Sequence, residues 1–459
     1  MTDNRIPDLS QPQAVHILGV GGAGMSAIAT VLHRFGHRVS GSDLKSSRDL
    51  ERVHALGVAT AVGHAAQNIP EDCSLVVHST AVGADNVELG AARARGIPVY
   101  RRAEVLAAMT RLRRTIAVAG SHGKTTTTSM LSIMLRRADM HPSFLIGGEV
   151  NEIGTNAATD SGELFIVEAD ESDGTFVTLA RAGAIVTNVE PDHLDHYGGF
   201  DGLVAAFEAF ADGVDGPLLC CADDAGSRRL TTGRANARTY GFAADADVRI
   251  ANYVGSRAGS HFDLVVDGSE LGHIELPVAG RHNAQNAAGA AAMAMALGAS
   301  FPAIASALAT FGGVARRFQM RGEFNGATFI DDYAHLPSEV QAAIIAAREG
   351  SWGRVIVVFQ PHRYTRTRQL WSDFAGAFVG ADRLILTDVY SSGESPIPGV
   401  TGRLILRAVL DANPEMNVMY LPHREDLVRE IPKLCRNGDV VLTLGAGDLT
   451  TLPDAVIHG

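Results

Sequence analysis

The sequence predicts an α/β protein that is built from three domains in a row. Apolar, strand-like runs alternate with helical stretches along most of the chain, which is typical of mostly parallel sheets covered by helices. Several of these runs end at glycine-rich turns, and such turns commonly hold anionic ligands at a helix N-terminus. The chain has 459 residues, and domains of about 100–200 residues would divide it into two to four.

The composition excludes several classes of protein. With 46% hydrophobic and 20% charged residues, the chain can bury sizeable cores and is not expected to be disordered. A formal net charge of -12 argues against nucleic acid as the main partner, because phosphate backbones bind basic surfaces. The four cysteines lack zinc spacing and are interpreted as buried thiols in a reducing compartment. With no signal peptide and no membrane-spanning tract, we expect a cytoplasmic protein without a membrane partner.

The first domain is expected at residues 1–111. Residues 14–43 contain an apolar run, glycines, a helical stretch and a second strand, which together predict a βαβ unit. Gly19, Gly21 and Gly24 fit the pattern G-x-G-x-x-G, and Asp43 follows about 20 residues later. These residues predict a Rossmann-like domain that binds a diphosphate. The glycines alone leave two ligands open, NAD and a uridine diphosphate sugar, because both place a diphosphate at a helix N-terminus.

The second domain is expected at residues 112–318. Its predicted strands cover residues 114–120, 163–170, 182–189 and 217–223, and the helical stretches between them indicate a mostly parallel sheet. The segment 246–280 differs, since two alternating runs flank an Asp-Gly pair. This pattern predicts an antiparallel hairpin, and therefore a small added sheet.

The third domain is expected at residues 319–459. Strands are predicted at residues 327–332, 354–360, 383–389 and 439–447. Helical stretches again separate them, so this domain is also predicted to be Rossmann-like.

A phosphate-binding loop is predicted inside AVAGSHGKTTTTSM, residues 117–130. Gly123, Lys124 and Thr125 fit the end of the pattern G-x-x-x-x-G-K-[ST], although Val118 stands where its first glycine should be. Backbone N–H groups of this loop can still point at phosphates, while Lys124 reaches the outer phosphates and Thr125 a magnesium ion. The chain has lysine only at positions 45, 124 and 433, which favours a specific role for Lys124. The alternative is an ordinary glycine-rich turn.

Acidic residues follow two of the predicted strands in the second domain. Glu168 and Asp170 end one strand, and Glu190, His193 and Asp195 follow another. In open α/β sheets the carboxyl ends of strands supply ligands, and magnesium prefers oxygen ligands. Each residue alone could simply cap a loop. Together, beside a phosphate loop, they predict a magnesium site.

A basic loop follows the predicted strand at 354–360. QPHRYTRTR, residues 360–368, has three arginines, one histidine and no acid. Such a loop is often a solvated surface. At the carboxyl end of a strand it instead favours an anion site, and a planar guanidinium matches a carboxylate through two hydrogen bonds.

Nine motifs along the chain resemble those of the Mur ligases, ATP-dependent amide-forming enzymes of peptidoglycan synthesis. The resemblance covers essentially the whole chain and is strongest to the branch that joins L-alanine to UDP-N-acetylmuramate. The motifs are GVGGAGMS (19–26), GSHGKTTTTSM (120–130), EADESDGTF (168–176), TNVEPDHLDHY (187–197), GRHNAQNA (280–287), RRFQMRGE (316–323), DDYAHLP (331–337), FQPHRYTRT (359–367) and DVYSSGESPIPG (388–399).

The chain departs from the family pattern at two points. The third-domain motif often has two histidines before its proline, but here the second is Leu336, so only His335 corresponds. Some relatives use a carbamylated lysine near the metal, whereas this chain has no lysine between 124 and 433. The second departure fits the alanine-adding branch, which the resemblance implies does without that modification.

The resemblance implies a two-step reaction. The carboxylate of UDP-N-acetylmuramate attacks the γ-phosphate of ATP and forms an acyl phosphate, and the amine of L-alanine then displaces phosphate. Magnesium and ATP are the implied cofactors, and a monomer or weak dimer is expected. A uridine diphosphate sugar replaces NAD as the expected first-domain ligand, since hydride transfer needs no ATP loop. The alternatives are a sister ligase for another amino acid or a peptide, and a non-catalytic nucleotide-sensing protein.

The resemblance also assigns residues to each ligand. The implied catalytic residues are Lys124, His193 and Arg317. ATP would contact Gly120, Ser121, His122, Gly123, Lys124, Thr125, Thr126 and Arg317, with its adenine on Asn283 and its ribose on Asp332. The UDP phosphates would contact Gly21, Gly22, Ala23, Gly24, Met25 and Ser26, and the uridine end Asp43. Alanine would contact Tyr333, His362, Arg363 and Arg366. The implied magnesium ligands are Thr125, Glu168 and His193.

Overall fold

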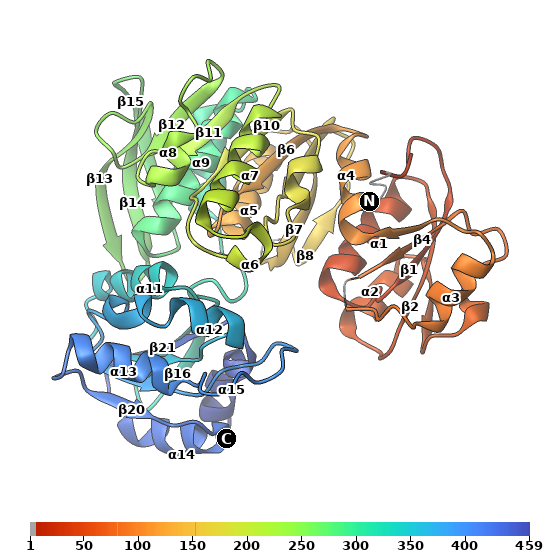
Figure 1. Cartoon of the computed structure of the whole chain (residues 1–459). Helices are drawn as coiled ribbons and strands as arrows, with labels where there is room; N and C mark the ends of the chain where they lie inside the picture. The colour runs from red at the N-terminus through yellow and green to blue at the C-terminus, as the bar shows by residue number, and fades with distance from the viewer. Residues whose placement is uncertain (1–5, 80, 152) are drawn as a thin grey trace. The chain divides into compact units, whose positions relative to one another are not determined.

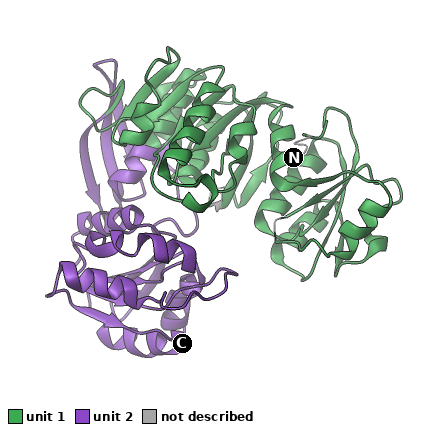
Figure 2. Ribbon diagram, in the orientation of Figure 1, with its two compact units in different colours: residues 1–249, 287–307 green, residues 250–286, 308–459 purple. Residues whose placement is uncertain are grey.

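The computed structural model describes residues 6–79, 81–151 and 153–459 and confirms the predicted α/β class. The described strands form three sheets (Figure 1). The chain divides into two compact units, one of residues 1–249 and 287–307 and the other of residues 250–286 and 308–459 (Figure 2). The first sheet lies in unit 1, the central sheet has strands in both units, and the third sheet lies in unit 2. The predicted domain boundaries at 111 and 318 stay predictions.

The first sheet is parallel throughout. Its strand order is β3-β2-β1-β4-β5, and its strands are β1 (Ala14–Leu18), β2 (Arg38–Asp43), β3 (Ala59–Val62), β4 (Leu75–His78) and β5 (Val99–Arg101). All five residues of β1 are buried, as expected for a central parallel strand. The sequence pattern does not predict β3, a short edge strand whose side chains stay partly or fully exposed.

The central sheet has the order β15-β14-β13-β12-β11-β10-β6-β9-β7-β8. Its strands are β6 (Arg114–Ala119), β7 (Ser143–Val150), β8 (Thr155–Ala158), β9 (Leu164–Glu168), β10 (Gly183–Val186), β11 (Leu218–Cys221), β12 (Ala237–Gly241), β13 (Val248–Ser256), β14 (Gly259–Val266) and β15 (Ser269–Leu276). Strands β14 and β15 pair antiparallel through a turn in which Asp267 and Gly268 both have positive φ. This confirms the predicted hairpin. It joins the central sheet through β13 and does not form a separate one.

The third sheet has the order β16-β17-β21-β18-β19-β20. Its strands are β16 (Gln319–Phe324), β17 (Ala327–Asp332), β18 (Val355–Phe359), β19 (Arg383–Leu386), β20 (Val418–Tyr420) and β21 (Val440–Leu444). Only β16 runs antiparallel to its neighbour. The central strands β18 and β21 are buried along their whole length. Of the residues predicted for alanine, Tyr333 follows the carboxyl end of β17, and His362, Arg363 and Arg366 follow that of β18.

Helices separate most of the strands. They are α1 (Ala23–Arg34), α2 (Arg48–Ala55), α3 (Val87–Ala94), α4 (Arg102–Thr110), α5 (Lys124–Arg137), α6 (Leu194–Tyr197), α7 (Phe200–Asp212), α8 (Ala225–Arg229), α9 (Arg281–Ala296), α10 (Phe301–Ala309), α11 (Pro337–Glu349), α12 (Tyr364–Leu370), α13 (Arg403–Ala412), α14 (Arg424–Leu434) and α15 (Leu452–Ile457). Within the described ranges, no helix has both the length and the apolar character needed to cross a membrane. All four cysteines are free thiols, three buried and Cys435 partly buried.

A buried polar network supports the first predicted ligand site. The Glu88 carboxylate accepts hydrogen bonds from the Ser42 hydroxyl at 2.6 Å and the Asn68 amide at 2.7 Å, and lies 3.1 Å from the His16 ring. Burial alone would raise the pKa of Glu88, but these hydrogen bonds outweigh it and lower the pKa to about 2. The Ser42 carbonyl in turn accepts from Gly19 N–H at 2.8 Å. The network therefore fixes the neighbouring carboxyl ends of β1, which the glycine loop follows, and of β2, which ends at Asp43.

Candidate active site

The first glycine loop is closed by Asp43, at the carboxyl end of β2. The Gly21 N–H donates to Asp43 Oδ2 at 2.9 Å, and the Ser47 hydroxyl donates to the Gly21 carbonyl at 3.0 Å. A Cβ at position 21 would lie 2.9 Å from Ser47 Oγ, so a side chain there would displace Ser47 from the loop. Met25 and Ser26 are buried, and their N–H groups donate to the Gly22 carbonyl at 3.0 and 2.9 Å, so their contacts with a ligand stay predictions.

Arg102, at the start of α4, lies against the glycine loop. A Cβ at position 24 would come within 2.4 Å of the Arg102 guanidinium, so Gly24 provides the space for this side chain. Arg102 also acts on Asp170: burial would raise the pKa of Asp170, but Lys124, with a smaller contribution from Arg102, keeps it lowered. The guanidinium thus adds positive charge beside the N-terminus of α1, where a diphosphate is expected. The sequence motifs did not predict this residue.

The predicted phosphate loop lies between β6 and α5. Gly120 has φ +135°, and a Cβ there would clash with Thr187. The Ser121 N–H donates to the Asn188 carbonyl at 3.2 Å, and the His122 N–H donates to the Asn188 side chain at 2.8 Å. Gly123 caps α5 in the left-handed conformation. The loop is therefore held by the segment after β10, although Val118 breaks the general sequence pattern.

Lys124 is fixed in this loop by three acceptors. Its ammonium donates to the carbonyls of Gly120 at 2.6 Å and Ser121 at 3.3 Å, and to Glu171 Oε2 at 2.8 Å. Burial would lower the pKa of Lys124, but Glu171, Asp170 and Glu168 outweigh it and raise the pKa. Lys124 is consequently charged at neutral pH. Glu171 belongs to the motif EADESDGTF, yet its partner could not be read from the sequence.

Two of the three predicted magnesium ligands are neighbours. The Thr125 hydroxyl donates to Glu168 Oε1 at 3.0 Å, and Glu168 Oε2 accepts from Gly147 N–H at 2.7 Å. His193 lies at the N-terminus of α6 with φ +52°, and its Nε2 is 3.3 Å from Asp192 Oδ2. Among the described residues, no group of three or more His, Cys, Asp and Glu side chains could hold a metal ion. The hydroxyl and carboxylate oxygens of Thr125 and Glu168 nonetheless suit a hard cation.

Three residues predicted to contact ATP lie in unit 2. They are Asn283 for the adenine, Asp332 for the ribose and Arg317 for the phosphates. The Asn283 amide, at the start of α9, donates to the Ala279 carbonyl at 2.7 Å. Asp332 ends β17 and accepts from the N–H groups of Phe318 and Ala334, both at 2.7 Å; burial raises its pKa to about 6. The Arg317 guanidinium packs over the Tyr333 ring at 5.0 Å. Their roles toward ATP stay predictions.

The half-buried His362 and the buried Arg366 form a pair after β18. Arg366, on α12, donates to His362 Nδ1 at 3.1 Å and is 8% exposed. Burial, together with the charge of Arg366, lowers the pKa of His362 to about 3. His362 is therefore neutral at pH 7 and accepts at Nδ1. The His362 ring also contacts two other rings. Its centre is 5.9 Å from that of His335 and 5.7 Å from that of Tyr390.

Arg363 has a different partner. Its Nε donates to Glu394 Oε1 at 2.6 Å, and Thr365 donates to the same carboxylate through its N–H at 3.0 Å and through its hydroxyl. Arg363 caps α12 with φ +70°. Glu394 thus ties the loop 388–399 to the start of α12. The charge of Arg363 is therefore offset by Glu394.

Leu336 stands where many relatives in the resembled family have histidine. It is buried, at 2% exposure, and caps α11. Its N–H and that of His335 donate to Glu339 Oε2 at 3.1 and 2.8 Å. The departure therefore leaves the helix start intact, while His335 keeps its ring 5.4 Å from Tyr333.

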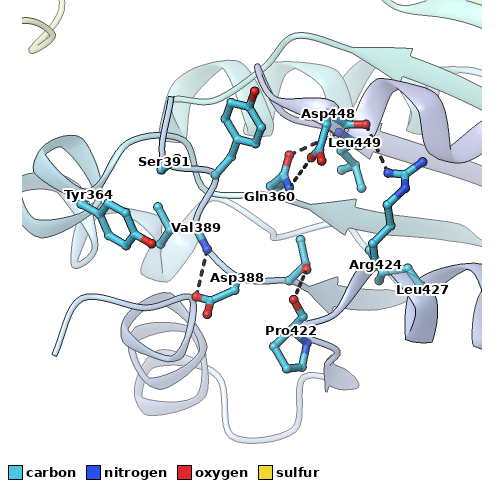
Figure 3. A pocket seen from close by; sticks show the side chains of 12 residues that line it. Gln360, Tyr364, Asp388, Val389, Ser391, Pro422, Arg424, Leu427, Asp448 and Leu449 are labelled. Atoms are coloured by element: carbon cyan, nitrogen blue, oxygen red, sulfur yellow. Dashed lines mark hydrogen bonds between the residues drawn. The ribbon is translucent and has the colours of Figure 1, made fainter. Parts of the chain in front are cut away.

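A cavity of about 310 Å³ lies at the carboxyl ends of β18, β19 and β21 (Figure 3). Two hydrogen bonds connect lining residues. The Gln360 amide donates to Asp448 Oδ1 at 2.9 Å, and Arg424 donates to the Asp448 carbonyl at 3.2 Å. The described lining includes none of the four residues predicted for alanine. Tyr390 connects the cavity to that cluster, because it lines the cavity and stacks on His362.

Three Mur ligase profiles match consecutive parts of the chain. They are described as the catalytic domain of the Mur ligase family for residues 14–114, the Mur ligase middle domain for residues 118–294, and the Mur ligase glutamate ligase domain for residues 316–447.

Curated relatives match almost the whole chain. The UDP-N-acetylmuramate–L-alanine ligase of Pelotomaculum thermopropionicum is 45% identical over 96% of this chain and 96% of its own. The protein of the same name from Rhizobium meliloti is 44% identical over 95% of this chain and 94% of its own.

Solved structures show the same fold. The UDP-N-acetylmuramate-alanine ligase of Thermotoga maritima covers 97% of this chain and 98% of its own, with a TM-score of 0.79 and 27% identity. A murein peptide ligase from Psychrobacter arcticus has a TM-score of 0.69 at 22% identity, with 97% of this chain and 98% of its own covered, and supports the fold alone. With profiles matching all three parts and relatives at 45% identity, this chain belongs to the Mur ligase family.

Proposed function

We propose that this protein joins L-alanine to the carboxylate of UDP-N-acetylmuramate with the hydrolysis of ATP to ADP and phosphate. The observation that carries the proposal is the 45% identity, over nearly the full length of both chains, to a curated ligase of that name. The phosphate loop around Lys124 supports the ATP half of the reaction, and the Arg366–His362 pair supports the amino-acid half.

The first step would transfer the γ-phosphoryl group of ATP to the muramate carboxylate. Both reactants are anionic, so positive charge must offset their repulsion and stabilise the transferring group. Lys124 supplies a fixed charge at the loop. Thr125 and Glu168 would hold a magnesium ion, with His193 as the third predicted ligand, and such an ion would supply positive charge for phosphoryl transfer.

The second step would bring the alanine amine to the acyl carbon. Arg366 presents a planar guanidinium that fits the alanine carboxylate, and its bond to neutral His362 holds it in place. Tyr333 and Arg363 complete the predicted pocket. Arg317 stays a predicted phosphate ligand of ATP.

Phosphate release with a panel of amino acids tests the proposal. Release should require ATP, UDP-N-acetylmuramate and L-alanine together. Release with a peptide or another amino acid, but not with alanine, would indicate a sister ligase. ATP binding without any amino-acid-dependent release would indicate a nucleotide sensor.

The first-domain site gives a separate prediction. UDP-N-acetylmuramate should raise the melting temperature and NAD should not, because a ligand that binds only the folded state stabilises it. Asp43→Ala and Arg102→Gln should both reduce this protection, the second because it removes a charge beside the glycine loop. The matched control is Arg101→Gln, at the exposed neighbouring position. Protection by NAD alone would overturn the assignment of this loop.

A further inference from the structure

The bonds of Lys124 raise the question of how this side chain can meet a phosphate. An ammonium group has three N–H donors, and Lys124 directs hydrogen bonds to three protein oxygens. Two of these oxygens are carbonyls of the loop itself, from Gly120 and Ser121. The third belongs to the Glu171 carboxylate. A phosphate oxygen that binds Lys124 must therefore replace, or share, at least one of these acceptors.

Glu171 is the acceptor that competes most directly with phosphate. Burial raises the pKa of Glu171 to about 7, and the charge of Lys124 opposes this rise. While it pairs with Lys124 the carboxylate carries negative charge, as phosphate does, whereas the other two acceptors are neutral carbonyls. Charge-assisted hydrogen bonds are roughly twice as strong as neutral ones. The Glu171–Lys124 pair is also screened from water, with the two side chains 2% and 12% exposed. The free energy of this pair consequently opposes nucleotide binding.

Glu171 cannot easily turn away to make room. Its backbone carbonyl accepts from the Tyr197 hydroxyl and from Gly174 N–H at 3.0 Å. The residue as a whole is 1% exposed. A buried carboxylate that loses its cation pays a large desolvation penalty, so each step that draws Lys124 toward phosphate leaves Glu171 less well compensated.

We propose that Glu171 is a positioning residue that holds Lys124 in a resting position and thereby weakens the binding of ATP and ADP. The inference rests on the proposed function, since it takes Lys124 to be a phosphate ligand. Its consequence is easier release of ADP after each turnover. It deepens the proposed ATP site by adding a residue that sets nucleotide affinity.

The sign of an affinity change distinguishes this role from simple support of the loop. Glu171→Gln removes the competing charge, so the dissociation constants of ATP and ADP, measured by calorimetry without the other substrates, should fall by about tenfold, equivalent to about 1.4 kcal/mol. If Glu171 only supports the loop, the same substitution should weaken binding. Unchanged or weaker binding would overturn the inference.

The matched control is Glu163→Gln. It removes the same charge next to β9, but its side chain is 74% exposed and pairs with Arg114 at the opposite end of the strand. It should leave both dissociation constants unchanged. If Glu171→Gln does not fold, Glu171→Asp keeps the charge but withdraws it from Lys124, and should lower the constants in the same direction by a smaller factor.

Lys124→Ala separates the inference from the proposed function. If this variant binds ATP normally, Lys124 is not a phosphate ligand and the proposed site is wrong. If Lys124→Ala weakens binding but Glu171→Gln does not tighten it, only the inference fails. In the double variant, Glu171→Gln should bring no tightening relative to Lys124→Ala, because Glu171 acts through Lys124.

Discussion

Replacing Lys124 by alanine should abolish alanine-dependent phosphate release. The side chain is the fixed cation of the loop before α5, and three protein oxygens hold it there. Removing a preorganised group that stabilises developing charge costs roughly 10²–10³ in rate. The measurement is steady-state phosphate release with saturating UDP-N-acetylmuramate and L-alanine, with circular dichroism to verify folding.

Lys433→Ala is the control for this substitution. Lys433 is one of only three lysines in the chain, and its side chain is 59% exposed and pairs with Glu430 on α14. Its loss should leave turnover near that of the unmodified protein. A folded Lys124→Ala variant with near-normal turnover would contradict the role given to the loop.

The sequence predicts the parts of the fold that rest on long buried strands. The predicted strand at residues 327–332 matches β17, and the Asp-Gly turn at Asp267 and Gly268 predicts the hairpin. The strands β3, β7, β8, β12, β16 and β20 are missed. Of these, β3, β8, β16 and β20 lack a run of buried side chains and show little apolar patterning. Their place is set by pairing with a neighbour and not by local sequence.

The candidate site likewise contains residues that the sequence predicts and contacts that it does not. Thr125 and Glu168 are predicted together, and the structure places them 3.0 Å apart, because strands β6 and β9 are adjacent and parallel. Which acidic side chain pairs with which arginine is harder to predict from the sequence. Arg363 and Glu394 are 31 residues apart, and nothing in the motif QPHRYTRTR indicates which arginine an acid will neutralise. Arg102 lies outside the quoted motifs and is found only through its contact with Gly24.

Replacing Arg366 by lysine should separate alanine selection from ATP chemistry. The substitution keeps the charge but loses the planar fork that fits a carboxylate. Charge-assisted hydrogen bonds contribute about 1.5–3 kcal/mol, so the KM for L-alanine should rise by about tenfold or more. The KM for ATP should change little, because Arg366 is proposed to bind the alanine carboxylate, whereas the loop around Lys124 is proposed to bind the phosphates.

The step that precedes alanine attack should survive the same substitution. Acyl-phosphate formation from ATP and UDP-N-acetylmuramate can be followed without alanine, by borohydride trapping or isotope exchange, and should continue in Arg366→Lys. Arg368→Lys is the matched control, since Arg368 lies on α12 as well but is exposed, and it should change neither KM. If Arg366→Lys raises the KM for ATP as much as that for alanine, Arg366 belongs to the phosphate site. The alanine pocket would then lie nearer Tyr333 and His335, whose rings are 5.4 Å apart.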